Sequence, residues 1–303
     1  MISICTLADS KFAIKFLALR ESIRNHTSEY TINLLCLDDD IFKLINNNCK
    51  EVNCHNIKDL LNSDKELKKS QNNKPSFESL NLCGGNEKGA KKLQFIWSLA
   101  SYYSWYCLKH CNIDDIVYVD ADIYFFEDPT RILDLKDFGS IGLIENRVPY
   151  NPVNGLYNVG IVYFKNDKDG QSCAAFWKDC LLHDDNEYAS AYGTCGDQKY
   201  LELFPKLYNS VFKIDDYLGH LAPWNIHHHQ YIADKILWNG KLQKLLFYHF
   251  SNFKEDLKNK TYIPAPRHGI LNLKNNKFVF SLYEQYFKDM ESLNENIIWN
   301  DCI

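Results

Sequence analysis

The segment VYVDADIYFFEDP, residues 117–129, places two carboxylates directly behind an apolar run. That run, DIVYV at residues 115–119, is typical of a buried β-strand, and Asp120 and Asp122 follow it. Residues two apart on an extended chain point to the same side. Two carboxylates held this way repel each other unless a cation lies between them, and Mg²⁺ or Mn²⁺ prefers such oxygen ligands. We therefore predict a divalent-metal site at Asp120 and Asp122. The alternative is a solvated acidic turn.

The rest of the chain predicts an α/β fold with a mainly parallel central sheet. Residues 2–7 and 31–37 are short apolar strands, and residues 12–24 between them have helical spacing. This β-α-β order is typical of a parallel sheet covered on both faces, whose ligands bind beyond the carboxyl ends of the strands. Further strands are expected at residues 140–144, 157–164 and 244–250, and further helices at residues 93–109, 174–182 and 197–204.

We expect residues 1–303 to form a single domain, because no linker or internal repeat interrupts the pattern. Residues 62–92 are rich in Asn, Lys and Ser and contain two adjacent glycines, which predicts a polar insertion that is mostly loop. The tail of residues 270–303 is expected to be helical, with apolar residues at helical spacing from 281 to 296. Packing against the body is the expected role of that helix, and partner or membrane binding is the alternative.

Composition argues against some functions and locations. The net charge of -5 and the pI near 6.1 give no sign of a nucleic-acid partner. The eleven cysteines include no Cys-x-x-Cys pair, so we expect the reduced thiols of a cytoplasmic protein. The first residues lack a secretory pattern, and no apolar stretch reaches the roughly 18 residues that cross a bilayer. A peripheral membrane contact stays compatible with the sequence, which makes no prediction of oligomeric state.

The segment VYVDADIYFFEDP resembles the metal-binding motif of GT-A-fold glycosyltransferases. Four further segments follow in the order expected for such enzymes: NVGIVYFKND at residues 158–167, GDQKYLELFP at 196–205, LAPWNI at 221–226 and FYHFSNF at 247–253. Each segment is modest alone, but four in order are specific. Over about residues 2–253 the chain is similar to nucleotide-diphospho-sugar transferases distantly related to glycosyltransferase family eight. The resemblance implies a Rossmann-like GT-A fold.

The resemblance implies which residues hold the nucleotide and the metal. The end of the first strand would hold the base and ribose. The residues at that end are Thr6, Leu7, Ala8 and Asp9. Capping the next helix is an alternative role for Asp9. The metal would bind Asp120 and Asp122, on either side of Ala121, with His249 as the third ligand, although a lone histidine is more often structural.

The resemblance also implies which residues face the sugars. Asn158 matches an asparagine that faces the donor sugar, and Asp197 and Gln198 match an Asp-Gln pair beside it. Asp197 would bind sugar hydroxyls, and Gln198 would support positive charge near the anomeric carbon. A turn residue at Asn158 and a helix N-cap at Asp197 are the alternatives. Trp224 and Asn225 are expected to contact the acceptor or the sugar.

Basic and small residues complete the expected site. Lys254 is a candidate to contact the diphosphate, as are Lys91 and Lys92 ahead of the aromatic helix. Gly160 would let the backbone approach closely. Consecutive histidines cannot converge on one ion, so the run at residues 227–229 is expected to be a polar loop.

These features predict a metal-dependent glycosyltransferase of the hexosyltransferase kind. It is expected to move a sugar from a nucleotide-diphosphate donor, UDP-sugar by resemblance, to a glycan, lipid-linked or protein acceptor, as in polysaccharide biosynthesis. No general base for an inverting displacement is evident, and the resemblance of Asp197 and Gln198 to the Asp-Gln pair of retaining relatives implies retention. One alternative is a phosphohydrolase of the haloacid-dehalogenase type, in which the first aspartate of Asp-x-Asp is a nucleophile. The other is a transferase-like domain that binds a glycan without turnover.

Overall fold

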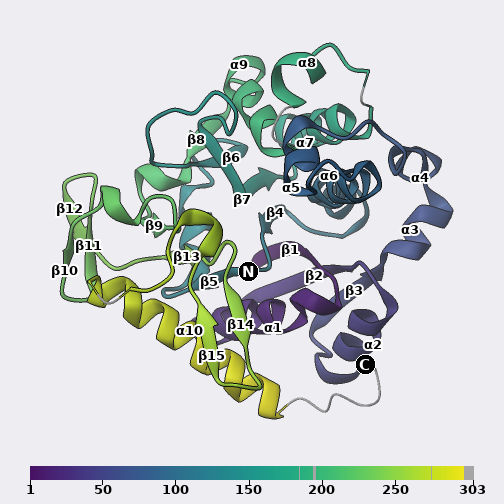
Figure 1. Cartoon of the computed structure of the whole chain (residues 1–303). Helices are drawn as coiled ribbons and strands as arrows, with labels where there is room; N and C mark the ends of the chain where they lie inside the picture. The colour runs from purple at the N-terminus through teal and green to yellow at the C-terminus, as the bar shows by residue number, and fades with distance from the viewer. Residues whose placement is uncertain (184, 194–195, 274, 297–303) are drawn as a thin grey trace.

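A seven-stranded sheet forms the centre of the protein in the computed structural model (Figure 1), which describes residues 1–183, 185–193, 196–273 and 275–296. The strands lie in the order β3-β2-β1-β4-β7-β6-β8. Their bounds are Ile2–Ala8 (β1), Tyr30–Cys36 (β2), Val52–Asn56 (β3), Asp115–Val119 (β4), Ile141–Glu145 (β6), Tyr157–Lys165 (β7) and Val211–Lys213 (β8). Neighbouring strands pair in parallel except for β7, which is antiparallel to both β4 and β6. The sheet is therefore mainly parallel, as the sequence predicts.

Helices cover both faces of this sheet (Figure 1). Residues of α1 (Ala13–Arg24) and α2 (Asp39–Asn48) share one buried apolar cluster with β1, β2 and β4. Residues of α6 (Glu87–His110) and α7 (Lys168–Leu182) share another cluster with the opposite side of the same strands. Because strand side chains alternate between faces, Ile4 lies in the first cluster and Cys5 in the second. Burial on both faces explains why these strands are nearly continuous apolar runs.

Residues 62–92 are largely helical, so the prediction of a loop there is wrong. The segment contains the end of α3 (Ile57–Ser63), then α4 (Lys65–Ser70), α5 (Phe77–Leu82) and the first turns of α6. Asp64, Ser76 and Asn86 accept hydrogen bonds from the backbone at the starts of α4, α5 and α6. Composition pointed to a loop because these short helices are mostly exposed, whereas their capping residues were a usable helix signal.

A second, three-stranded sheet joins distant parts of the chain. It has the order β5-β13-β9, formed by Ile123–Phe125, Phe247–His249 and His220–Leu221. The strand expected over residues 244–250 is thus only three residues long, and residues 197–204 form a 3-10 helix, η4 (Gln198–Leu203), rather than an α-helix. The short helices α8 (Ala189–Tyr192) and α9 (Phe204–Leu207) flank η4. The antiparallel pairing of β13 with β5 positions the site described below.

The C-terminal helix α10 (Lys277–Asn296) packs on a third apolar cluster (Figure 1). Phe250 stacks on Tyr286 at 3.9 Å between ring centroids, and Tyr124 donates a hydrogen bond to Asp289. The expected tail helix is confirmed for residues 277–296, and residues 297–303 lie outside the described part. The remaining small strands are Tyr231–Ile232 (β10), Lys235–Trp238 (β11), Lys241–Gln243 (β12), Lys254–Asp256 (β14) and Thr261–Ile263 (β15). No helix among the described residues is long and apolar enough to span a bilayer.

Candidate active site

Asp120 and Asp122 lie in the turn between β4 and β5, at the carboxyl end of the central sheet. The backbone fixes this turn: the Asp120 amide donates to the Gly160 carbonyl at 2.9 Å, and the Ile123 amide donates to the Asp120 carbonyl at 3.0 Å. Tyr118, two residues earlier on β4, donates its hydroxyl to Asp120 Oδ1 at 2.7 Å. The carboxylate of Asp120 is therefore oriented by a residue on the same face of its own strand.

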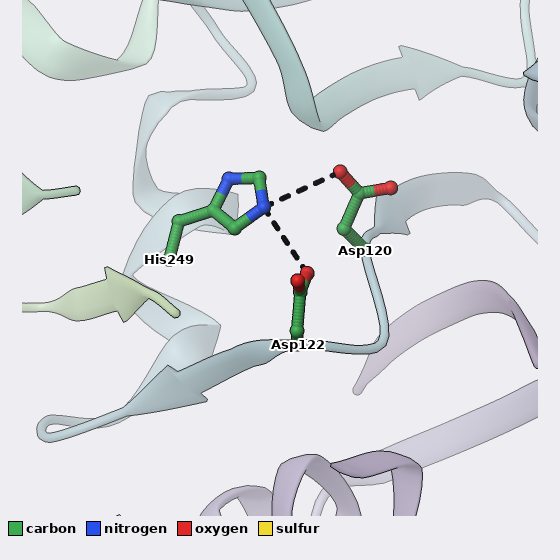
Figure 2. Close-up of side chains that lie close together, drawn as sticks. All are labelled: Asp120, Asp122 and His249. Atoms are coloured by element: carbon green, nitrogen blue, oxygen red, sulfur yellow. Dashed lines mark ion pairs between the residues drawn. The ribbon is translucent and has the colours of Figure 1, made fainter. Parts of the chain in front are cut away.

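His249 completes a cluster with the two aspartates (Figure 2). It ends β13 and lies opposite Ile123 of β5, which puts it next to Asp122. Its Nε2 is 3.1 Å from Asp122 Oδ1 and 3.6 Å from Asp120 Oδ2. One ligand atom from each of the three residues lies within 4.8 Å of the others. His249 is 127 residues from Asp122 in the sequence and further still from Asp120. The three side chains converge because β13 pairs with β5.

The charges in this cluster are strongly coupled. Burial alone would lower the pKa of His249, but the charge of Asp122, its hydrogen bond and the charge of Asp120 together raise it. Burial works against ionisation of Asp122 as well, yet His249 lowers the pKa of Asp122 below its ordinary value. Burial raises the pKa of Asp120, which His249 only partly offsets. A positive charge on His249 and the negative charge of Asp122 thus stabilise each other.

These residues fit a divalent cation. Two carboxylate oxygens and an imidazole nitrogen form a donor set that suits Mn²⁺ or Mg²⁺ better than a soft, thiolate-preferring metal. A cation of charge two would replace the proton of His249 and balance both carboxylates. The other ring nitrogen of His249, Nδ1, is buried and has no partner among the described residues. The three side chains therefore offer a compact set of oxygen and nitrogen donors that could hold a metal ion.

Gly160 is tightly enclosed beside this cluster. A Cβ atom at Gly160 would lie 2.7 Å from His249 Nδ1 and 2.7 Å from Asn158 Oδ1. Such contacts are closer than van der Waals packing allows, so any side chain here would displace the histidine. The close approach expected at this glycine is thus an approach to His249.

The cluster forms the floor of a cleft with a volume of about 460 Å³. Five carboxyl groups line the cleft, and no lysine or arginine is among the described residues that do so. The carboxyl groups belong to Asp9, Glu78, Asp120, Asp122 and Asp197. An anionic ligand such as a diphosphate would meet net repulsion here unless a cation were bound.

The first strand meets the cleft at its end, as predicted, but not with every expected residue. Leu7, Ala8 and Asp9 line the cleft, whereas Thr6 is fully buried and lies behind it. Asp9 also accepts a hydrogen bond from the Phe12 amide at 3.1 Å. Asp9 therefore caps the following helix and also lines the cleft.

Asn158 and Gln198 both line the cleft and are hydrogen-bonded to each other. Asn158 Nδ2 donates to Gln198 Oε1 at 3.0 Å, and Asn158 Oδ1 accepts from the Gly160 amide at 2.9 Å. Gln198 Nε2 donates to the Asn154 carbonyl at 2.8 Å. Both ends of the Gln198 amide are thus held, which fixes its orientation over the cleft.

Asp197 is buried beside Gln198 and lines the cleft. Burial and then the charge of Asp120 raise the pKa of Asp197 well above its ordinary value. It occupies the N-cap position of η4, but its side chain accepts no capping hydrogen bond from the described residues. The helix-capping alternative therefore does not explain this aspartate.

Trp224 lines the cleft, whereas Asn225 has a structural place. The Trp224 ring meets His249 edge-on at 5.3 Å, and its Nε1 has no partner among the described residues. Asn225 is fully buried, accepts from the Ala222 amide at 2.9 Å and does not line the cleft. The expected contact of Asn225 with substrate is therefore not supported by its position.

The candidate lysines all lie off the cleft. Lys91 forms an ion pair with Glu87 at 2.8 Å, and Lys91 and Lys92 line a separate surface hollow. Lys254 is exposed on the edge hairpin formed by β14 and β15. Lys91 and Lys92 do not line the cleft because a different face of α6, with Leu93, Ile96 and Trp97, lies toward it.

Several cleft residues were missed in the sequence. Tyr118 could have been found from its spacing of two from Asp120 on a strand. The apolar α6 residues that line the cleft recur at spacings of three and four in the sequence, which is typical of one face of a helix. Trp97 also lies against Gly196, whose φ of +53° and close contact leave no room for a side chain. The histidines of residues 227–229 form no metal cluster with described residues, and His229 stacks on Trp238 at 4.6 Å.

Solved glycosyltransferase structures share this fold. The mouse xyloside xylosyltransferase 1 aligns with 82% of this chain and 97% of its own, with a TM-score of 0.55 and 14% identity. The galactosyltransferase LgtC, solved with donor and acceptor sugar analogs, aligns with 82% of this chain and 87% of its own, with a TM-score of 0.50 and 12% identity. The protein therefore has the GT-A fold of glycosyltransferases.

Sequence comparison gives the family. The profile of glycosyl transferase family 8 matches residues 3–173, and the chain belongs to that family. It is therefore a glycosyltransferase. A relative, the uncharacterized protein YfnD of Bacillus subtilis (strain 168), is 24% identical over 82% of this chain and 76% of its own. The family match overturns the phosphohydrolase alternative.

Proposed function

We propose that this glycosyltransferase is metal-dependent and uses Asp120, Asp122 and His249 to hold Mn²⁺ or Mg²⁺. The observation that carries the proposal is the convergence of these three side chains on the floor of an acidic cleft. Because the described lining includes no lysine or arginine, the chain itself offers a diphosphate little positive charge. A bound cation would supply positive charge opposite the diphosphate leaving group.

The residues along the cleft suggest how a nucleotide sugar is oriented. The nucleotide, UDP in our proposal, lies against Leu7, Ala8 and Asp9 at the end of β1. The sugar lies toward the other end, where Asp197 and Gln198 offer hydrogen-bonding groups. Held in this direction, the anomeric carbon faces the fixed amide of Gln198, and positioning contributes to the rate.

We further propose that transfer proceeds with retention of the anomeric configuration. Gln198 is not a base, and its amide is held by Asn158 and by the Asn154 carbonyl. Its carbonyl dipole can support positive charge at the anomeric carbon, and Asp197 can bind a sugar hydroxyl. The acceptor is a glycan, whether free, lipid-linked or on a protein, as in polysaccharide biosynthesis. Opposite anomeric configurations in donor and product, read by NMR, would contradict retention.

The release of nucleoside diphosphate tests the proposed function. Purified protein is incubated with a panel of UDP- and other nucleotide sugars and Mn²⁺, alone and with a chelator. We expect slow release from one donor, abolished by the chelator and reduced at least about tenfold in Asp122→Asn. The matched control is Asp39→Asn, an aspartate that lies outside the cleft and pairs with Lys58. Release that survives both the chelator and Asp122→Asn would contradict metal dependence.

A further inference from the structure

A surface with two tyrosines lies beside η4, the helix that begins with the cleft residue Gln198. Its members are Tyr150, Tyr192, Glu202 and Lys206, which we call the tyrosine platform. Tyr150 is 59% exposed, on the loop that connects β6 to β7. Tyr192 ends α8, Glu202 lies on η4 and Lys206 on α9. The platform is thus formed by elements that surround Gln198, the first residue of η4.

The platform is held together by hydrogen bonds. Lys206 Nζ donates to the Tyr192 hydroxyl at 2.9 Å and lies 5.2 Å from the centre of that ring. Glu202 Oε1 accepts from the Leu156 amide at 2.8 Å, which ties the loop of Tyr150 to η4. Partial desolvation and then the Glu202 carboxylate raise the pKa of the Tyr150 phenol. The aromatic rings and the charged groups therefore form one surface.

The loop under Tyr150 is joined directly to the cleft. Gln198 Nε2 donates to the Asn154 carbonyl at 2.8 Å, and Lys199 donates to the Pro152 carbonyl. Gly155, with a φ of +78°, brings the backbone close to Glu202, since a Cβ there would lie 3.1 Å from Glu202 Oε1. A ligand on this surface would consequently meet the opening of the cleft at Gln198.

We propose that the tyrosine platform binds the acceptor glycan. Exposed tyrosine rings pack against the C–H faces of sugar rings, and Glu202 and Lys206 can exchange hydrogen bonds with hydroxyl groups. The position beside Gln198 lets an acceptor hydroxyl reach the donor sugar. This inference rests on the proposed direction of the donor in the cleft. It assigns the acceptor to Tyr150 and Tyr192 rather than to the apolar wall of α6.

Binding of defined disaccharides tests the platform. Lactose, cellobiose and N,N′-diacetylchitobiose are added to the protein with saturating UDP and Mn²⁺, and binding is followed by saturation-transfer NMR. We expect at least one to bind with transfer to its ring C–H protons, and Tyr150→Ala to weaken that binding about three- to tenfold. Tyr150→Phe keeps the ring and should stay within about twofold of the wild type. Phe280→Ala, which removes an exposed aromatic ring from α10, is the matched control and should have no effect.

Calorimetry of UDP with Mn²⁺ on the same samples separates this inference from the proposed function. UDP affinity in Tyr150→Ala should stay within about twofold of the wild type, because the platform lies outside the nucleotide end of the cleft. If UDP does not bind the wild type, the proposed function fails. If UDP binds but no disaccharide does, or if Tyr150→Ala binds the disaccharide as the wild type does, the platform is overturned.

Discussion

The precision of the metal cluster depends on single residues beside it. Gly160 leaves room for His249 only because it has no side chain, and Tyr118 fixes the rotamer of Asp120 through one hydrogen bond. Groups that orient metal ligands commonly affect metal affinity almost as much as the ligands themselves. Each of the two residues touches a proposed metal ligand, and neither is itself a proposed ligand.

Gly160→Ala should weaken Mn²⁺ binding by about tenfold or more, because its Cβ would force His249 away from the aspartates. Calorimetric titration of Mn²⁺ measures the effect, and a thermal melt checks that the variant folds. Gly89→Ala is the control, since a Cβ there meets its nearest neighbours at 3.5 Å, an ordinary contact. Unchanged Mn²⁺ affinity in Gly160→Ala would show that His249 is not a ligand.

Mn²⁺ binding should weaken as the pH falls, because His249 must lose a proton before Nε2 can bind metal. Asp122 and Asp120 raise the pKa of His249, so this competition begins above the ordinary histidine value of about 6.5. The raised pKa of Asp120 acts in the same direction. Titrations in two buffers of different ionisation enthalpy should show proton release on binding. Constant affinity from about pH 5.5 to 8, with no proton release, would contradict the role of His249.

At the level of helices and strands, the sequence predicts five of the seven strands of the central sheet and misses β3 and β8. The strand at residues 115–119 is found with the predicted bounds, because a buried strand is a continuous apolar run with clear ends. Helices α4 and α5 were missed because each is only six residues long and shows few buried residues. Their signal was in the caps, Asp64 and Ser76, and not in the periodicity.

Some side chains of the site could be predicted from the sequence, and others could not. Asp120 and Asp122 were predicted from their position behind a buried strand and their spacing of two, whereas His249 was reached only through a family resemblance. Lys92 and Asn225 were misplaced because the direction of a side chain depends on which face of its element packs inward. That choice is made by tertiary contacts, such as those of α6 with α7, which no local pattern records.

An ion pair connects three elements of secondary structure. Arg147 pairs with Asp215, which is fully buried, and its Nη2 donates to the Asp215 carbonyl at 2.7 Å. The guanidinium also lies 4.9 Å from the centre of the Trp238 ring. The pair therefore connects the end of β6, the 3-10 helix at Ile214–Asp216 and β11.

Arg147→Met should lower the free energy of unfolding by about 3–5 kcal/mol, because it leaves Asp215 buried without its cation. Denaturant unfolding measures the change. Arg24→Met removes a more exposed arginine, 3.7 Å from Glu21, and should cost no more than about 1 kcal/mol. Equal losses in the free energy of unfolding of the two variants would show that burial does not increase the contribution of the Arg147–Asp215 pair to stability.

In the molecule as a whole, α10 returns to pack against elements from the first half of the chain. Tyr286 lies edge-on to Tyr124 at 5.7 Å and stacks on Phe250, which follows the ligand His249. The apolar cluster here also includes Ile14 and Ala18 of α1. We therefore propose that the described residues unfold together as one domain.

Tyr286→Ala tests this proposal by calorimetric unfolding. The buried ring should be worth about 3–5 kcal/mol, and its loss should shift one common transition to lower temperature. Phe280→Ala, on the exposed side of the same helix, should leave that transition nearly unchanged. A separate early transition for the C-terminal part, with the main one unaffected, would contradict a single domain.

We propose that the acidic cleft binds a nucleotide through a metal held by Asp120, Asp122 and His249. Titration of UDP into the protein by calorimetry, with Mn²⁺ and then with a chelator, tests it most directly, using the wild type and Asp122→Asn. We predict binding only for the wild type with Mn²⁺, because the cleft alone repels the diphosphate. Equal UDP affinity with the chelator, or in Asp122→Asn, would contradict the claim.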